Sequence, residues 1–205
     1  MPIDFTLKRV DVFRNLPHGE PELVHAFFAA SANGFYVDVG ANHPTEDSQS
    51  WHLECLGWHG LLIEPLPHYC AMLKASRRGT VIQVACSSPV NDGQFMPMLV
   101  AGVHSTLNAN PIALGAHAHD VMQVPTRTLD SVLLENQVKP GFDLLSIDVE
   151  GHEMEVFQGF DLSRWQPRLV LLEDHVIGLE KHRYMLSHGY QLLMRTGLNA
   201  WYVPQ

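Results

Sequence analysis

Four apolar segments of the chain end in carboxylates, and segments with a helical pattern of apolar residues lie between them. They are residues 35–42, 60–65, 142–150 and 169–174, whose acids are Asp38, Glu64, Asp148 with Glu150, and Glu173 with Asp174. Strands that alternate with helices of about ten residues form βαβ units, so this pattern predicts an α/β fold around a mainly parallel sheet. Because the carboxyl ends of parallel strands share one edge of the sheet, we expect the acids to surround one polar site there.

The remaining segments complete this alternation. Helices are expected at residues 19–32, 48–56, 67–78, 128–136, 152–158 and 179–188, and further strands at 81–85, 95–100, 121–125, 190–194 and 201–203. The last two strands predict an antiparallel hairpin at the edge of the sheet. Residues 1–205 are interpreted as a single domain, with 1–32 as an N-terminal arm and helix. Residues 87–127 interrupt the alternation, which is typical of an inserted lid or substrate-binding element.

Composition narrows the classes of protein to consider. The 205 residues are 46% hydrophobic and 17% charged, and the formal net charge of −9 disfavours a general nucleic-acid-binding surface. No apolar run reaches the ~20 residues that a membrane-spanning helix needs. The first residues do not resemble a secretory signal, so a cytoplasmic protein is expected. The three cysteines lack CxxC spacing, which favours buried free thiols. The sequence leaves a monomer and a homodimer open.

The turn after the first of the four segments indicates the kind of ligand. Gly40 allows a positive φ or a close approach of the backbone, and Glu64, at the end of the next segment, could accept hydrogen bonds from the two hydroxyls of a ribose. Asn42 stands where a second glycine would be needed to admit a pyrophosphate. The pattern therefore favours a nucleoside without bridging phosphates, S-adenosylmethionine above all. An NAD-linked or nucleotide-sugar enzyme of the Rossmann type is the alternative.

Six motifs between residues 34 and 174 resemble, in order and spacing, those of the FkbM-like S-adenosylmethionine-dependent methyltransferases. They are VDVGAN, LECLGWHGLLIEPLPHY, HSTLN, TRTLD, DLLSIDVEGHEMEVFQGFD and LVLLED. The resemblance implies a class I methyltransferase (Rossmann-like) fold, with a sheet of seven strands, the last antiparallel, and helices on both faces. It also implies O-methylation of a hydroxyl on a saccharide or other small-molecule natural product. A non-catalytic subunit that binds S-adenosylmethionine is the second alternative.

The same resemblance gives individual residues a role at the cofactor. Asp38, Gly40 and Asn42 would hold the methionine part, Glu64 the ribose, and Ala85 with Cys86 would lie near the adenine. Ser105, Thr106 and Asn108 match the family's STL segment and would close over cofactor or acceptor, although each could equally cap its own loop.

Methyl transfer to an aliphatic hydroxyl needs help in removing the proton, either from a base or from a metal. Asp148, His152 and His175 are the catalytic candidates. The two histidines follow two of the acidic segments and could act as bases, although His152 could instead cap its helix. Asp148, Glu173 and Asp174 alternatively form an oxygen-rich site suited to Mg²⁺. Without a metal, these carboxylates would raise one another's pKa.

Overall fold

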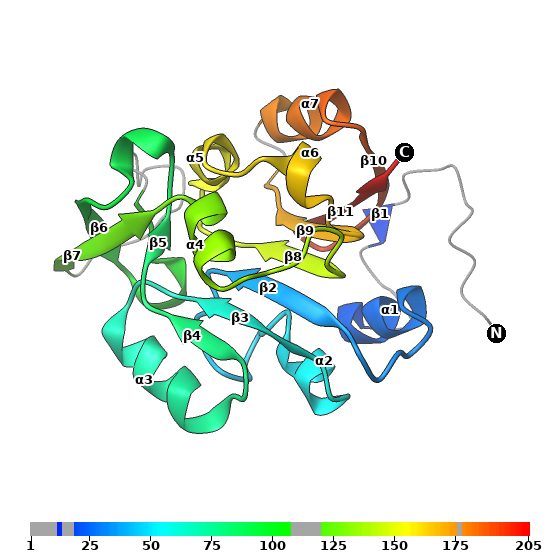
Figure 1. Ribbon diagram of the computed structural model, residues 1–205, viewed down its shortest axis with the longest axis horizontal. Helices are drawn as coiled ribbons and strands as arrows, with labels where there is room; N and C mark the ends of the chain where they lie inside the picture. The colour runs from blue at the N-terminus through cyan, green and yellow to red at the C-terminus, as the bar shows by residue number, and fades with distance from the viewer. Residues whose placement is uncertain (1–11, 14–18, 108–119, 176–177) are drawn as a thin grey trace.

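A computed structural model describes residues 12–13, 19–107, 120–175 and 178–205. Its main sheet has the strand order β1-β10-β11-β9-β8-β2-β3-β4 (Figure 1). The strands are β1 (Val12–Phe13), β2 (Phe35–Val39), β3 (His59–Ile63), β4 (Thr80–Ile82), β8 (Leu144–Ile147), β9 (Leu169–Glu173), β10 (Tyr190–Thr196) and β11 (Asn199–Pro204). β11 runs antiparallel to both of its neighbours and the other pairs are parallel. The predicted α/β fold with a mostly parallel sheet is confirmed.

The order of the strands reverses beside β2. The chain passes from β2 to β3 and β4 on one side and later returns to β8 and β9 on the other. Val39 at the end of β2 is level with Ile63 of β3 and Ile147 of β8. Three parallel strands thus stop together where connections leave in opposite directions, which is where open α/β sheets bind ligands.

Helices cover both faces of the sheet, as expected (Figure 1). α1 (Glu20–Phe27), α2 (Trp51–Cys55) and α3 (Pro67–Ser76) pack on the face that carries Tyr36 and Leu62. α4 (Leu129–Glu135), α5 (Glu153–Gln158), α6 (Leu162–Trp165) and α7 (Glu180–Ser187) pack on the face that carries Val37 and Val39. Both faces of the central strands are therefore buried, which explains their nearly continuous apolar sequences.

The strand expected at residues 81–85 is divided in the structure. β4 ends at Ile82, and the chain then leaves β3 to form β5 (Ala85–Cys86), which pairs with β7 (Asp120–Arg127). β7 pairs in turn with β6 (Phe95–Val100), so that a second sheet of three strands stands beside the main one. Two 3-10 turns, η1 (Pro89–Asn91) and η2 (Gly102–His104), belong to the same region. Much of the interruption at 87–127 is therefore ordered β-structure.

Further differences from the sequence prediction concern α1, β1, α2 and α6. α1 ends at Phe27, although a helix was expected to residue 32. The short strand β1 lies in the segment interpreted as an irregular arm. α2 begins at Trp51 rather than at residue 48, because the hydroxyl of Ser48 accepts backbone hydrogen bonds in the preceding turn. The single turn of α6 was not predicted, and the Asp161 carboxylate caps it by accepting the N–H of Arg164 at 3.1 Å.

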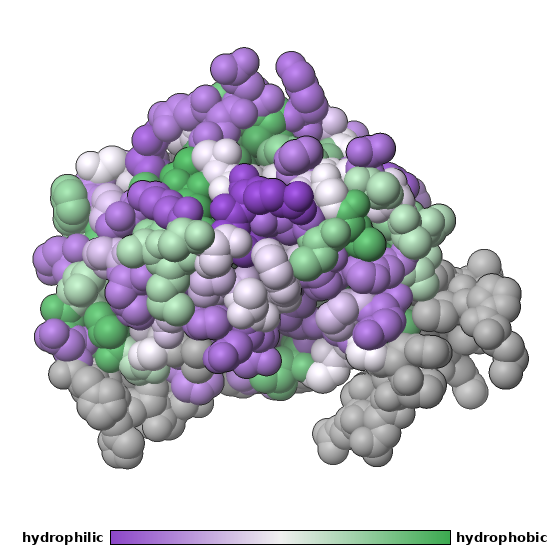
Figure 2. All heavy atoms as spheres, turned by 90° about the horizontal axis from the view of Figure 1, so that it is seen from below, coloured by the Kyte–Doolittle hydropathy of each residue, from purple (hydrophilic) through white to green (hydrophobic). Residues whose placement is uncertain are grey.

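The surface seen in Figure 2 mixes polar and apolar residues, and the apolar ones form small separate groups. Among the described residues, no helix has both the length and the hydropathy needed to cross a bilayer. Cys70 and Cys86 are buried free thiols, as predicted. Cys55, the last residue of α2, is exposed.

Candidate functional site

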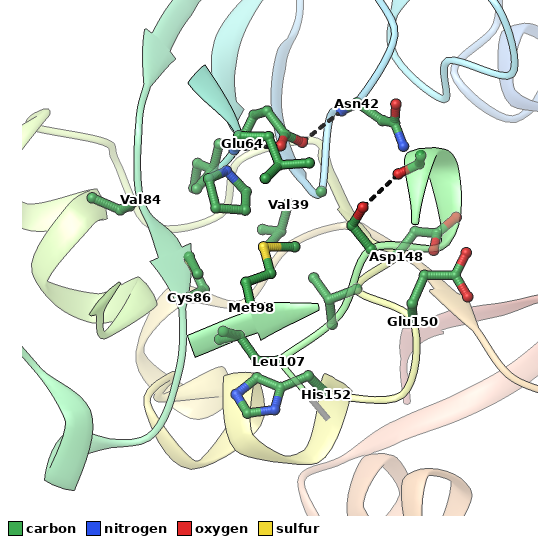
Figure 3. Close-up of a pocket in the computed structure, with 18 residues that line it drawn as sticks. Val39, Asn42, Glu64, Val84, Cys86, Met98, Leu107, Asp148, Glu150 and His152 are labelled. Carbon is green, nitrogen blue, oxygen red and sulfur yellow. Dashed lines mark hydrogen bonds between the residues drawn. The ribbon is translucent and has the colours of Figure 1, made fainter. Parts of the chain in front are cut away.

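A cavity lies at the carboxyl ends of β2, β3 and β8 (Figure 3). In this view the acidic Asp148 and Glu150 lie on one side, and Val84 and Cys86 on the other. The cavity is lined by Val39, Gly40, Asn42, Ile63, Glu64, Pro65, Leu66, Val84, Ala85, Cys86, Met98, Gly102, Ser105, Leu107, Asp148, Val149, Glu150 and His152. A ligand there would meet one apolar wall and one acidic wall.

Gly40 determines the shape of the turn at the centre of the cavity. Its φ is +88°, and a Cβ atom at this position would lie 1.8 Å from the carbonyl oxygen of Asp148. The expected close approach is therefore made to the neighbouring strand, which lets the turn after β2 and the end of β8 lie side by side. Asn42 follows with a left-handed φ of +47°.

Glu64 is held in place by the backbone around it. Its Oε2 accepts the N–H of Asn42 at 3.0 Å, and its Oε1 accepts the N–H of Leu66 at 2.8 Å. The residue is only 3% exposed. Burial raises the pKa of Glu64 to about 7, although the two N–H groups act in the opposite direction. Each carboxylate oxygen keeps one direction from which a ligand hydroxyl could donate.

The wall beyond Glu64 is apolar and comes from the second sheet and the start of α3. Leu66, Ala85 and Met98 are buried together in a small cluster, and Cys86 lies next to them. Burial raises the pKa of the Cys86 thiol to about 12, so this cysteine is neutral and packs as a small apolar residue. A flat apolar ring would fit such a wall.

Carboxyl groups gather at the opposite wall. Burial and the carboxylates of Glu173 and Glu150 raise the pKa of Asp148 well above its ordinary range. Burial, followed by the Glu150 carboxylate, raises the pKa of Glu173 to about 7. These acids come from the ends of β8 and β9, as the strand pattern predicted.

Comparison with known proteins identifies the family. A family model for the methyltransferase FkbM domain matches residues 38–192, which is most of the chain. The chain belongs to the FkbM methyltransferase family. The match confirms the resemblance seen in the sequence motifs and supports a methyltransferase.

A solved structure shares the fold of this FkbM chain. The crystal structure of methyltransferase FkbM from Methylobacillus flagellatus KT superposes with a TM-score of 0.56 and 16% sequence identity, over 90% of this chain and 50% of that one. The chain thus spans about half the length of that protein. Among curated proteins, none matches the sequence.

Within this FkbM domain, six of the expected cofactor residues line the cavity and Asp38 does not. Residues alternate along β2, and Asp38 shares the face of Tyr36. Its carboxylate accepts the hydroxyl of Ser50, which also accepts from Arg77 at 2.9 Å. The same guanidinium binds the buried Glu54 at 3.0 Å. The Asp38 side chain thus belongs to a buried polar network with Ser50 and Arg77 and does not line the cavity.

The two expected histidine bases lie in different surroundings. His152 lines the cavity at its margin (Figure 3), and its Nε2 is 3.0 Å from the hydroxyl of Ser87. Burial lowers the pKa of His152. It precedes α5 but makes no side-chain cap hydrogen bond. His175 is not among the described lining residues, and its Nε2 lies 3.0 Å from Oε1 of Glu173.

The structure also groups the acids differently from the expected metal site of Asp148, Glu173 and Asp174. Asp174 binds Arg195 at 2.8 Å, with Lys181 at 3.7 Å, so its charge is already matched by cationic side chains. Glu173 instead lies with Glu150 and His175, whose candidate ligand atoms are all within 4.8 Å of one another. The reason is the turn at Glu150, where a φ of +54° follows the end of β8.

The STL segment reaches the cavity through backbone and side chain together. The hydroxyl of Ser105 donates to the carbonyl of Gly102 at 2.6 Å and accepts the N–H of Ala101 at 2.9 Å, so it caps its own turn while lining the cavity. The Thr106 hydroxyl donates to the carbonyl oxygen of Glu150 at 2.8 Å. Asn108 lies outside the described residues. The segment therefore connects the second sheet to the acidic wall.

Several lining residues were not predicted from the sequence. Met98, Gly102 and Leu107 come from the second sheet and its turns, and Leu66 comes from the start of α3. The STLN motif offered a signal for Leu107. Met98 offered none, because an apolar residue in a short strand is most often part of the core.

Proposed function

We propose that this chain transfers a methyl group from S-adenosylmethionine to a hydroxyl of a saccharide or another small molecule. The observation that carries the proposal is Glu64, a buried carboxylate whose oxygens are fixed by backbone N–H groups at the end of the second central strand. A ribose with two free hydroxyls has two donors that match its two oxygens. Membership of the FkbM family supports methyl transfer as the reaction.

We orient the proposed donor by the chemistry of the two walls of the cavity. With the ribose on Glu64, the adenine would lie against Ala85 and Cys86, and the methionine part would extend past Gly40 and Asn42 toward the acidic wall. The sulfonium is positively charged, so carboxylates on that side favour this direction over the reverse one. Asp38 has no part in this arrangement, because its carboxylate is bound to Ser50.

The reaction needs alignment and the removal of one proton. The acceptor oxygen forms a bond to the methyl carbon, the carbon–sulfur bond breaks to leave S-adenosylhomocysteine, and the hydroxyl proton moves to a base. We assign the base to Asp148, which lines the cavity and whose raised pKa makes it a stronger proton acceptor than an ordinary carboxylate. His152, held by Ser87 at 3.0 Å, is a positioning residue at the margin.

The second sheet would provide the acceptor side. η2 and the residue that follows it bring Gly102 and Ser105 to the cavity. Since these groups come from the long interruption in the strand–helix alternation, we assign its described residues, 87–107 and 120–127, to contact with the acceptor and to exclusion of water.

Calorimetric titration of the chain with S-adenosylhomocysteine and, separately, with NAD tests this function. One equivalent of S-adenosylhomocysteine should bind, and NAD should give no heat, because Asn42 replaces the glycine that would admit a pyrophosphate. Binding of NAD alone would support the rival Rossmann enzyme. Binding of S-adenosylhomocysteine without methylation of any hydroxylated compound from a broad screen would support a non-catalytic subunit.

A further inference from the structure

Three potential metal ligands converge beside the cavity from the ends of β8 and β9. One carboxylate oxygen each from Glu150 and Glu173 and one ring nitrogen of His175 all lie within 4.8 Å of one another. Nε2 of His175 lies 3.0 Å from Oε1 of Glu173. An ion about 2.0–2.3 Å from each ligand fits between groups at such separations after small side-chain movements.

Glu173 has a second oxygen that the surrounding protein leaves unused. The residue is 6% exposed, and its Oε2 has no hydrogen-bond partner within the part of the chain that the structure describes. A buried carboxylate oxygen without a hydrogen-bond donor destabilises the fold, because it has lost its hydrogen bonds to water and no protein group replaces them. A bound cation, or a proton shared with the neighbouring Asp148, would stabilise Oε2 of Glu173.

The nearby cations are directed to other groups. Lys181 binds the carboxylate of Glu153 at 3.1 Å and the backbone carbonyl, not the carboxylate, of Glu173 at 2.8 Å. Glu150 interacts with the ring of His104 at 3.0 Å, and that ring is largely exposed. The carboxylates of Glu150 and Glu173 are thus faced by the imidazole rings of His104 and His175.

We propose that Glu150, Glu173 and His175 bind a divalent first-row transition metal ion such as Mn²⁺. Two carboxylates and one imidazole form a mixed oxygen and nitrogen set, which suits Mn²⁺ better than Mg²⁺ or Ca²⁺, since those two ions prefer oxygen alone. Glu150 also lines the cavity, so the ion would stand at its acidic wall with open positions toward a ligand oxygen. The site does not depend on methyl transfer being the reaction.

Titration of the full chain, freed of metal by EDTA and dialysed, with Mn²⁺ tests the site. Electron paramagnetic resonance of the free ion counts what is bound, and one equivalent is expected. Glu173→Gln and His175→Ala should each weaken Mn²⁺ binding ~10-fold or more. Loss of a residue that only hydrogen-bonds to a metal ligand already costs about 10-fold in affinity, and loss of the ligand itself should cost at least as much. Mg²⁺ should compete only weakly.

Matched variants elsewhere separate this site from adventitious binding. Glu135→Gln and His59→Ala alter an exposed carboxylate and an exposed ring away from the trio, and should leave Mn²⁺ affinity unchanged. His175 is partly exposed, so its variant should fold even if the buried Glu173→Gln does not, and circular dichroism checks both. Absence of Mn²⁺ binding, or equal binding by wild type and His175→Ala, would overturn the proposal and favour a proton shared between Asp148 and Glu173.

Discussion

Replacement of Glu64 by glutamine should weaken binding of S-adenosylhomocysteine by roughly 10- to 150-fold. Both oxygens of Glu64 already accept a backbone N–H, at 3.0 and 2.8 Å, and the proposed function adds one ribose hydroxyl to each. Glutamine keeps one acceptor and turns the other into an N–H donor. It therefore loses one charge-assisted hydrogen bond to the ribose, worth about 1.5–3 kcal/mol.

The same substitution should have an opposite, pH-dependent effect on stability. The pKa of Glu64 is raised to about 7 by burial, so the folded chain holds a proton that the unfolded chain releases near 4.5. The contribution of Glu64 to stability is therefore full below about pH 4.5 and is lost as the pH rises through 7, by about 3 kcal/mol. Glutamine does not ionise. Between about pH 5 and pH 8, the free energy of unfolding of wild type should therefore fall by about 3 kcal/mol relative to that of Glu64→Gln. Urea denaturation of both proteins at the two pH values measures this difference.

Asp38→Asn is the matched control for the binding experiment. Asp38 is another buried carboxylate at the end of a central strand, with its pKa also raised by burial, but it faces Ser50 rather than the cavity. Its substitution should change binding by less than about threefold. Calorimetry at about pH 8, where Glu64 is mostly ionised, measures both variants. Unchanged affinity in Glu64→Gln, or an equal loss in Asp38→Asn, would refute the assignment of the ribose to Glu64.

Two further predictions concern the scaffold. Gly40→Ala should destabilise the chain by more than ~3 kcal/mol, because the added Cβ would meet the carbonyl oxygen of Asp148 at 1.8 Å. Gly141→Ala has a similar positive φ but open space around it, and should cost only about 1 kcal/mol in the same urea titrations. Arg77→Met should cost about 3–5 kcal/mol, because it leaves the buried Glu54 without its closest cation. A loss below ~1 kcal/mol would show that the hydrogen bonds of Glu54 to Tyr36 and the backbone suffice.

The layers of the fold could be predicted from the sequence because the apolar periodicities are strong. Strands such as residues 142–150 and helices such as 67–78 carry their own pattern and their own end signals. Glu64 could be placed for the same reason, since the end of a parallel strand must lie at the ligand-binding edge.

The details that were missed depend on contacts between distant segments. Both faces of β2 are buried, so its sequence does not reveal that Asp38 points to the side of Tyr36 rather than into the cavity. The grouping of Glu150 with Glu173 and His175 follows from a left-handed turn at Glu150. A positive φ is uncommon for residues other than glycine, so it could not be predicted from a glutamate in the sequence. The division of the strand at residues 81–85 depends on its pairing with β7, some forty residues later in the chain.

The most direct test of the account is a crystal structure of the chain with S-adenosylhomocysteine. The two ribose hydroxyl oxygens should lie about 2.5–3.0 Å from the carboxylate oxygens of Glu64, with the adenine against Ala85 and Cys86. The sulfur should lie on the side of Asp148. A ligand bound with its ribose away from Glu64, or outside the cavity at the ends of β2, β3 and β8, would contradict the proposed methyl-donor site.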